Sequence, residues 1–381
     1  MSVIHVLRTC QDRFRQYALP TAKGALPGMT NPRKTPTIQD VARSAKVSTA
    51  TVSRALSSPD RVSEDARARV FQAVEQTGYT LNQAARSLRQ RNSRTILVAL
   101  PDIGNTFFST ILDAIEREAV LRGYGVLVAN RFAAHDSGRR LHEYFLSNRA
   151  DGLLLLDGSV ALEPLLALAA PPIGVPLLMA CEDIDHAPFH SVRTDNEFAA
   201  EVATRHLIGL GHRAIGHIRG PVGNVLTAER EAGYRRALAL AGLEARPEWI
   251  IPAGFEMRQG LAAAERFMTL RERPSAMFAT NDETAIGFLS GLRQHGLDCP
   301  RDISVVGFDD LAFAAHFWPP LTTMRQPREA LGRIAAEALI DLIEGEPRRR
   351  VPRHTVLSSE LIVRGSTRVH IAAPELAEAV L

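Results

Sequence analysis

Polar and aromatic side chains follow several predicted strands of this 381-residue chain, at the points where the strands end. Asn281 follows the apolar run 276–279 after one intervening residue, and Asp309 comes directly after the run 304–308. Because ligands bind outside the carboxyl ends of parallel strands, we expect these groups to converge on a cleft. Their amide and carboxylate groups can bind ligand hydroxyls, and aromatic faces can stack on a ring. The further candidates of this kind are Arg230, Phe107, Phe108 and Phe255.

Each of these residues also has a purely structural interpretation. Asp282 and Asp310 are expected to be helix caps or structural partners rather than ligand contacts. Phe107 has an alternative place in the hydrophobic core. Asp309 and Arg230 are the strongest binding candidates, because a convergent pair of polar groups is what a pocket uses to orient a ligand.

The same residues do not form a recognisable catalytic constellation. Asp309 and Asp310 are adjacent in the sequence, so we expect them to diverge rather than to flank one bond. His212 and His217 lie five residues apart across a predicted turn and strand, and no G-x-S-x-G elbow or P-loop is present. We therefore expect a non-enzymatic protein without a cofactor or metal, and rank a nucleoside or sugar hydrolase last.

Alternating strands and helices must position the candidate ligand site. Such alternation predicts an α/β body of parallel sheets with helices on both faces, and two such sheets would form two lobes with a cleft between them. The expected strands are 95–101, 125–129, 152–156, 215–218, 276–279 and 304–308. The expected helices are 109–122, 136–148, 229–241, 260–270 and 285–295.

Ahead of this body, the stretch 37–56 (TIQDVARSAKVSTATVSRAL) predicts two short helices joined by a tight turn. Thr37 and Asp40 form a capping box at the start of the first helix, and Ser48 caps the second. Apolar residues recur at helical spacing in both helices. Helices this short cannot bury a core alone, but packed across a turn they form a helix-turn-helix.

The second helix is expected to present short side chains and one guanidinium outward, which suits a major groove of DNA. Arg54 can pair with guanine O6 and N7, and Ala50 can contact a thymine methyl group. Thr49 and Ser53 can reach bases or phosphates. The alternative is a generic amphipathic helical hairpin, which the pattern alone also fits.

A third helix and a short basic segment complete the predicted head. Ser63 is expected to cap a helix that ends at Gly78. The segment 82–89 (NQAARSLR) is too short to be stable as an isolated helix. It is either a solvated linker or a hinge helix that folds on DNA.

Charge and cysteine content agree with a nucleic-acid partner for the head. Residues 1–94 carry 16 basic against 6 acidic side chains, although the whole chain has a net charge of only +3. A basic head on an acidic body fits a polyanionic partner for the head. The three cysteines have no C-x-x-C spacing, no membrane span is predicted, and no signal-peptide core is present. We therefore expect a cytoplasmic protein.

These motifs resemble those of the LacI/GalR family of transcription regulators, over about residues 37–369. The matching residues are TIQDVA at 37–42, KVSTATVSRAL at 46–56 and RVS at 61–63. Within the family, the resemblance is greatest to its cytidine-responsive members. That closer resemblance rests on KVSTATVSRAL, SRTILV at 93–98, PDI at 101–103, FFS at 107–109 and ELIVRGSTR at 360–368.

The resemblance implies specific contacts to DNA and to a ligand. A leucine at the position of Leu88 wedges into the minor groove at the centre of the operator, and an apolar wedge of this kind bends the duplex. The matching hinge residues here are Ala84, Ala85, Ser87 and Leu88. The effector contacts map to Phe107, Phe108, Asp195, Arg230, Phe255, Asn281, Asp309 and Gln326. The loops 131–136 and 222–227 depart from the cytidine-type pattern, so the ligand does not carry over.

The resemblance also implies the domain boundaries. A helix-turn-helix headpiece at 37–80 and a hinge and linker at 81–94 precede a body at 95–370 that is similar to periplasmic binding proteins. Its chain crosses three times between lobe 1 (about 95–193 and 326–356) and lobe 2 (about 195–323 and 358–370). A tail at 371–381 follows, with no heptads for a tetrameric coiled coil. Residues 1–36 are expected to be a disordered basic extension, or else translation begins at Met29.

We therefore expect a homodimeric transcriptional repressor that binds a palindromic DNA operator. Its effector is expected to be a nucleoside such as cytidine, or a sugar. Two alternatives stay open at this point. One is a regulator that acts mainly through contact with another transcription factor, with the cleft secondary, and the other is the tethered hydrolase.

Overall fold

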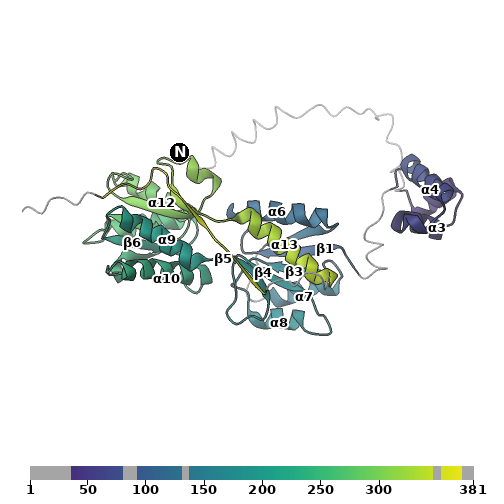
Figure 1. Ribbon diagram of the computed structural model, residues 1–381, viewed down its shortest axis with the longest axis horizontal. Coiled ribbons are helices and arrows are strands. Elements are labelled where there is room, and N and C mark those ends of the chain that lie inside the picture. Colours follow the sequence, from purple (N-terminus) through teal and green to yellow (C-terminus); the bar gives the residue numbers. More distant parts are fainter. Residues whose placement is uncertain (1–35, 80–91, 131–136, 346–352, 371–381) are drawn as a thin grey trace, which may run out of the picture. The chain divides into compact units, whose positions relative to one another are not determined.

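The computed structural model describes residues 36–79, 92–130, 137–345 and 353–370 (Figure 1). The chain divides into two compact units, Met1–Asn82 and Gln83–Leu381, which are described separately here as the headpiece and the body. Several predictions fall outside the described residues. These are the hinge residues Ala84, Ala85, Ser87 and Leu88, the extension ahead of residue 36, the loop 131–136 and the tail 371–381.

The headpiece is a bundle of three short helices around one small apolar core. The helices are α2 (Ile38–Ala45), α3 (Thr49–Ser57) and α4 (Glu64–Thr77), with a 3-10 turn at Pro59–Arg61 between the last two. The predicted capping box is present, because the Thr37 backbone N–H donates to Asp40 Oδ2 at 2.9 Å and the Thr37 side chain accepts from the Asp40 backbone. The core residues come from all three helices: Val41, Ala42, Ala45, Val52, Ala55, Val70 and Ala73.

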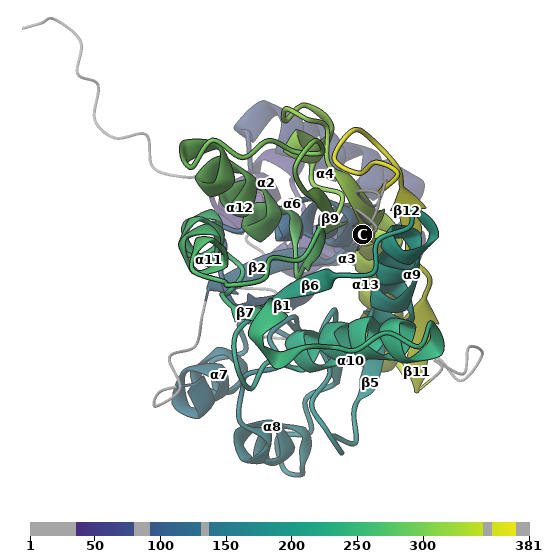
Figure 2. The ribbon, with the colours of Figure 1, turned by 90° about the vertical axis from the view of Figure 1, so that its left-hand side faces the viewer.

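The body contains two six-stranded sheets, each of which is the centre of one lobe (Figures 1 and 2). The first lobe has the strand order β11 (His354–Leu357), β5 (His190–Thr194), β4 (Leu177–Ala180), β3 (Gly152–Leu155), β1 (Thr95–Leu100) and β2 (Gly125–Asn130). The second has the order β12 (Glu360–Ile362), β10 (Thr322–Arg325), β9 (Ser304–Asp309), β8 (Ala276–Ala279), β6 (Ile215–Arg219) and β7 (Ile250–Pro252). The paired strands are parallel, except that β12 runs antiparallel to β10.

Helices cover both faces of each sheet, as the alternating pattern predicts. One core of the first lobe is formed with α6 (Phe107–Leu121) and α13 (Arg328–Glu344), and the other with α7 (Ser137–Leu146) and α8 (Leu162–Ala169). In the second lobe, α11 (Met257–Met268) and α12 (Asp282–Gln294) contribute to one core, and α9 (Asn196–Gly209) and α10 (Val225–Leu240) to the other. The central strands β1, β3, β4 and β8 are largely apolar because both of their faces are buried.

The chain passes between the two lobes three times, after β5, after β10 and after β11. Strand β10 belongs to the second sheet, whereas α13, which follows it, packs on the first sheet. The polar residues at these crossings therefore lie where the two lobes meet. Among the described residues, no helix is long and apolar enough to span a bilayer.

Several helices begin earlier than the apolar pattern predicts. Helix α10 begins at Val225 rather than at residue 229, since Asn224 caps it and accepts a 3.2 Å bond from the Thr227 backbone. Arg230 is therefore in the second turn of α10 and does not open the helix. Helix α12 likewise begins at Asp282 because the Asn281 side chain caps it. Both starts are missed for one reason: the helix is begun by a capping side chain, Asn224 or Asn281, that lies outside the apolar pattern.

Candidate ligand cleft and nucleic-acid interface

Helix α3 presents a polar face to solvent because its apolar residues point into the headpiece core. Val52 and Ala55 are fully buried, which fixes the orientation of the helix. Thr49, Ala50 and Arg54 are exposed, and Ser53 is half-buried. Ser48 holds the start of the helix by accepting a 3.1 Å bond from the Thr51 backbone N–H. The predicted DNA-reading residues therefore lie at the solvent-facing start and middle of one well-capped helix.

The body contains a small cavity between its lobes, of about 60 Å³. Residues of both lobes form its walls: Pro101, Asn105, Phe107, Phe108, Cys181, Glu182, Leu226, Arg230, Phe255, Asn281 and Asp309. Six of the eight predicted effector contacts are in this set. The two others, Asp195 and Gln326, are not among the described residues that line the cavity.

Arg230 is the buried cation of the cavity wall, with only 2% of its surface exposed. Its Nη1 donates to the Thr280 carbonyl oxygen at 2.6 Å, and its Nε donates to Asn196 Oδ1 at 3.1 Å. Its Nη2 lies 3.8 Å from Asp309 Oδ1, and the guanidinium stacks on the Phe308 ring at 3.8 Å from the ring centre. These partners compensate the loss of hydration that burial imposes on the charge.

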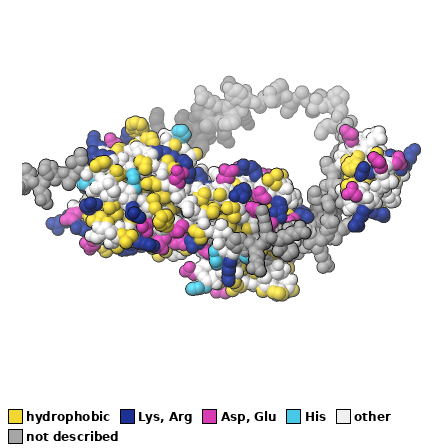
Figure 3. All heavy atoms as spheres, in the orientation of Figure 1, with side chains coloured by type: hydrophobic (Ala, Val, Ile, Leu, Met, Phe, Trp, Pro, Cys, Tyr) yellow, Lys and Arg dark blue, Asp and Glu magenta, His cyan; other side chains and the backbone are white. Residues whose placement is uncertain are grey.

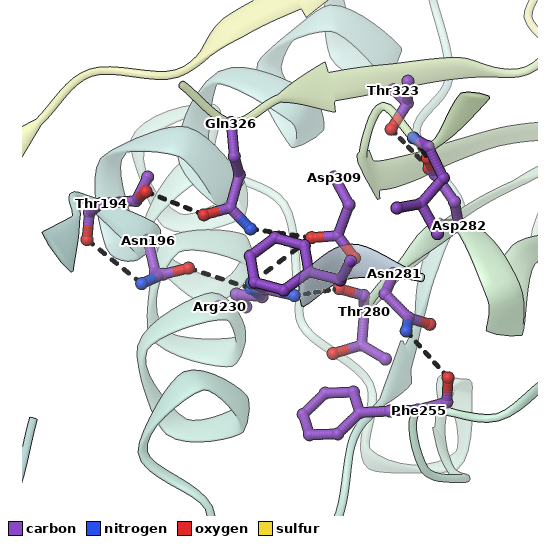
Figure 4. A network of polar contacts seen from close by, with 12 residues as sticks. Thr194, Asn196, Arg230, Phe255, Thr280, Asn281, Asp282, Asp309, Thr323 and Gln326 are labelled. Atoms are coloured by element: carbon purple, nitrogen blue, oxygen red, sulfur yellow. Dashed lines mark hydrogen bonds and ion pairs between the residues drawn. The ribbon is translucent and has the colours of Figure 1, made fainter. Parts of the chain in front are cut away.

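Asp309 and Gln326 link the ends of the two sheets (Figure 4). Gln326 Nε2 donates to Asp309 Oδ1 at 2.7 Å, and Gln326 Oε1 accepts from Thr194 Oγ1 at 2.8 Å. Thr194 ends β5 in the first lobe and Asp309 ends β9 in the second. Gln326 therefore supports the Asp309 carboxylate from behind, and its own side chain is engaged on both sides. Burial raises the pKa of Asp309, whereas Arg230 and Gln326 oppose that rise.

Asn281 and Phe255 form another part of the wall, from the second lobe. Asn281 Oδ1 caps α12 by accepting from the Thr284 backbone at 2.9 Å. Its Nδ2 donates to the Phe255 carbonyl oxygen at 2.8 Å, which holds the loop that carries the Phe255 ring. The ring is half-buried and lines the cavity. Asn281 therefore both caps a helix and positions an aromatic face.

Phe107 and Phe108 contribute the apolar wall from the first lobe. They begin α6, and their rings meet edge to face with centres 5.2 Å apart. Both are at least nine-tenths buried and belong to the core of the first lobe, and both also line the cavity. The structural and the ligand-binding interpretations of Phe107 are thus compatible.

The remaining acidic candidates have structural partners. Asp195 caps α9 by accepting from the Phe198 backbone at 3.0 Å, and its neighbour Asn196 is the residue that contacts Arg230. Asp282 accepts from the Leu311 backbone at 2.7 Å, and Asp310 forms an ion pair with Arg325 at 2.7 Å. The predicted structural roles of Asp282 and Asp310 agree with these contacts.

Glu182 lines the cavity and was not predicted from the sequence. It follows β4 and Cys181, whose φ of 69° turns the chain sharply. Its Oε2 accepts from the Gly158 backbone at 3.0 Å and, from the second lobe, from Asn224 Nδ2 at 3.2 Å. Burial, with a smaller contribution from Asp157, raises the pKa of Glu182 to about 7. No spacing motif marks it, because its neighbours in space come from distant parts of the chain.

Comparisons with known proteins give the same picture of a DNA-binding head on a two-lobed body. The profile for bacterial regulatory proteins of the lacI family matches residues 37–82, and the profile for periplasmic binding protein-like domains matches residues 204–367. The HTH-type transcriptional repressor CytR of Escherichia coli is 37% identical over 332 residues, which cover 87% of this chain and 96% of the relative. The repressor PurR of Vibrio campbellii is 32% identical and covers 87% and 98%.

Solved structures show the same similarity. The Lac repressor dimer bound to operator and the anti-inducer ONPF superimposes with a TM-score of 0.79 at 28% identity, covering 88% of this chain and all of that one. The complex of the transcriptional regulator CelR with cellobiose has a TM-score of 0.66 at 31% identity, covering 87% and 99%. A regulator from Enterococcus faecium with bound ribose has a TM-score of 0.64 at 26% identity, covering 73% and 100%.

Proposed function

The chain belongs to the LacI family of bacterial regulatory proteins, and from this premise we propose that it is a sequence-specific transcriptional repressor controlled by a small ligand. The headpiece binds operator DNA, and a ligand in the cavity between the lobes changes the affinity of the protein for that DNA. The protein is not an enzyme and acts in the cytoplasm, where its DNA partner lies. The exposed polar face of α3 is the observation that carries the DNA-binding part of this proposal.

We propose that α3 enters the major groove and that its outward side chains read base edges. Arg54 pairs with a guanine, because a guanidinium matches O6 and N7 together. Ala50 contacts a thymine methyl group, and Thr49 and Ser53 contact bases or phosphates. The capped start of α3 and the buried Val52 and Ala55 support this assignment, since they orient the face that carries these residues.

We propose that the protein acts as a homodimer on a palindromic operator. Two-fold symmetry of the protein requires two half-sites related in the same way. In Figure 3, hydrophobic side chains are interspersed with charged ones on the visible surface of the body. Val120 and Leu121 at the end of α6 and Leu127 and Val128 on β2 are exposed, and β2 is an edge strand of its sheet. Such an apolar edge suits burial against a second copy.

The proposed hinge lies outside the described residues and is supported by membership of the family. We propose that Ala84, Ala85, Ser87 and Leu88 form a helix in the minor groove when two copies meet on DNA. Leu88 inserts between base pairs, and the energy of unstacking is recovered through the contacts that a bent duplex permits.

The ligand is a small, uncharged ring compound, either a nucleoside such as cytidine or a sugar. The cavity combines the Phe255 and Phe108 rings with the polar groups of Asn281, Asp309 and Arg230, which is the usual composition of a site for such ligands. Similar proteins have been solved with cellobiose and with ribose bound. Asp195 and Gln326 act on this site from outside its walls, Asp195 through Asn196 and Gln326 through Asp309.

Selection of bound sequences from a random duplex library tests the proposed function. Full-length protein is expected to enrich one palindromic sequence, and the same sequence without its symmetry is expected to bind more weakly. Enrichment of no sequence, with uniform binding across the library, would overturn the proposal. Binding to the selected operator that no nucleoside or sugar alters would instead favour regulation through another protein.

A further inference from the structure

The Glu182 carboxylate occupies a position in the cavity wall that the proposed contacts do not use. Only 7% of its surface is exposed, yet it lines the cavity from the first lobe. The Gly158 backbone N–H and Asn224 Nδ2 both donate to the same oxygen, Oε2. A carboxylate held in this way has a fixed orientation, because two donors from two different loops define where Oε2 lies.

The other carboxylate oxygen, Oε1, accepts no hydrogen bond from the described residues. This oxygen is not one of the fully buried side-chain atoms without a hydrogen-bond partner, so it is not sealed off from the cavity. Glu182 therefore keeps one acceptor that solvent or a ligand can reach, in a side chain that is otherwise enclosed. A ligand that displaces solvent from this oxygen must supply a donor in its place, because a carboxylate oxygen that loses its donor without replacement is costly.

The charges of the cavity wall exclude one class of ligand. Among the described residues that line it, the side chains that carry formal charge are Glu182, Asp309 and Arg230. Arg230 is already engaged by the Thr280 carbonyl oxygen, by Asn196 and by Asp309. A phosphate group would thus meet two carboxylates and a single guanidinium that is already paired with one of them, whereas phosphate recognition normally uses guanidinium or ammonium groups in excess of the acidic groups.

We propose that Glu182 determines ligand specificity: its Oε1 accepts an N–H or O–H group from an uncharged ring ligand, and its charge keeps phosphorylated ligands out. The inference rests on the proposed function, in that the cavity is taken as the effector site. It adds a residue of the first lobe that contacts the ligand and discriminates against its phosphorylated form. Arg230, Asn281 and Asp309 contact the same ligand from the second lobe.

The substitution Glu182→Gln removes both the negative charge and the free acceptor while keeping the shape of the side chain. The amide oxygen can take the place of Oε2 and accept from Gly158 and Asn224, so the local fold is preserved. The amide NH₂ group then takes the place of Oε1, and the cavity presents a donor without charge where it had an acceptor. Glu163→Gln is the matched control, because Glu163 is an exposed residue of α8 in the same lobe.

The test measures, at pH 8, where the Glu182 carboxyl is ionised, the affinity of the full-length variants for two pairs of probes: cytidine with cytidine 5′-monophosphate, and ribose with ribose 5-phosphate. The wild-type protein and Glu163→Gln are expected to bind at least one neutral probe and to bind its phosphorylated counterpart more weakly. In Glu182→Gln, affinity for that neutral probe is expected to fall by about tenfold or more, as for one lost hydrogen bond to a charged group. The dissociation constant for the phosphorylated probe, divided by that for its neutral counterpart, is expected to fall towards one.

Three results would overturn the inference. The first is equal affinity of the wild-type protein for a neutral probe and its phosphorylated counterpart. The second is a Glu182→Gln variant in which the ratio of the two dissociation constants equals that of the wild type. The third is failure of all four probes to bind. Operator selection with the same protein keeps the two claims apart, since enrichment of a palindrome would uphold the DNA-binding function even where the ligand assignment fails.

Discussion

Gln326 and Asp309 are joined by a 2.7 Å hydrogen bond between the amide Nε2 and the carboxylate Oδ1. Gln326 lies at a crossing between the lobes, and its carbonyl oxygen accepts from Thr194 at the end of β5 in the first lobe. The orientation of the Asp309 carboxylate, at the end of β9 in the second lobe, is thereby tied to the first lobe. A ligand on Asp309 consequently contacts a group whose position depends on both lobes.

Replacing Arg230 by Met is expected to destabilise the body by about 3–5 kcal/mol, because it leaves the buried Asp309 without a counter-charge. Urea unfolding followed by tryptophan fluorescence measures this, since both tryptophans, Trp249 and Trp318, lie in the second lobe. Arg333→Met is the control. Its guanidinium is 53% exposed and pairs with Glu337, so a loss below about 1 kcal/mol is expected. Equal losses in the two variants would contradict the role of Arg230.

Replacing Arg54 by Ala is expected to relax sequence preference at one base pair in each half-site, at a cost of about 1–3 kcal/mol for the preferred base. A scan of all single substitutions in the selected operator measures this. Arg69→Ala on α4 serves as the control and is expected to leave base preference unchanged. If Arg54→Ala weakens binding to every sequence equally, Arg54 contacts phosphate and the assignment is wrong.

Affinity for a neutral ligand is expected to rise as the pH increases through about 7. Burial raises the pKa of Glu182 to about 7, Asp157 adds to that rise, and Arg230, Gly158 and Asn224 oppose it. The carboxylate that accepts the ligand's hydrogen is the form populated above this pH. The free energy of unfolding changes in the opposite direction. Because the folded-state pKa of Glu182 is raised, the stabilisation that this group provides at low pH is lost as the pH rises through about 7.

Cytidine titrations at pH 6 and pH 8 measure this dependence. The wild type is expected to bind more tightly at pH 8, and Glu182→Gln is expected to show no such difference, because its amide does not titrate. A pH dependence that survives in the variant would assign it to another group.

Replacing Gly287 by Ala is expected to force α11 and α12 apart and to destabilise the second lobe by about 1–3 kcal/mol. A methyl group there would fall on the carbonyl oxygen of Met257, in the facing helix. Gly209→Ala is the control, since nothing lies within 4 Å of the added carbon at the end of α9. Alanine there should be neutral or slightly stabilising. The melting temperatures of both variants measure this. A Gly287→Ala variant as stable as the wild type would contradict the close approach of α11 and α12 at Gly287.

The sequence predicts most of the fold because its signals are local. Each helix cap lies within a few residues of the apolar stripe that follows it, as for Thr37, Asp40 and Ser48. The alternation of apolar runs and amphipathic helices likewise follows from two buried sheet faces. The apolar pattern predicts the starts of α10 and α12 too late, because the capping residues Asn224 and Asn281 lie outside any apolar period.

The cavity was only partly predictable, for a reason of geometry. Asp309 and Asn281 end neighbouring strand regions of one sheet, so parallel topology alone brings them together. Glu182 reaches the same cavity from the other lobe, through a sharp turn at Cys181 and contacts with Gly158 and Asn224. Asp195 was predicted to contact the ligand, but its side chain caps α9 and it is not among the described residues that line the cavity.

The most direct test of ligand-controlled DNA binding is the dissociation constant of the full-length protein for its selected operator, with and without saturating cytidine. The account predicts a change of about 5–150-fold, the usual range of allosteric coupling, and an equal change in cytidine affinity when operator is present. Ribose and other nucleosides are measured in the same way. A dissociation constant that none of these compounds changes would contradict the claim that the cavity controls the headpiece.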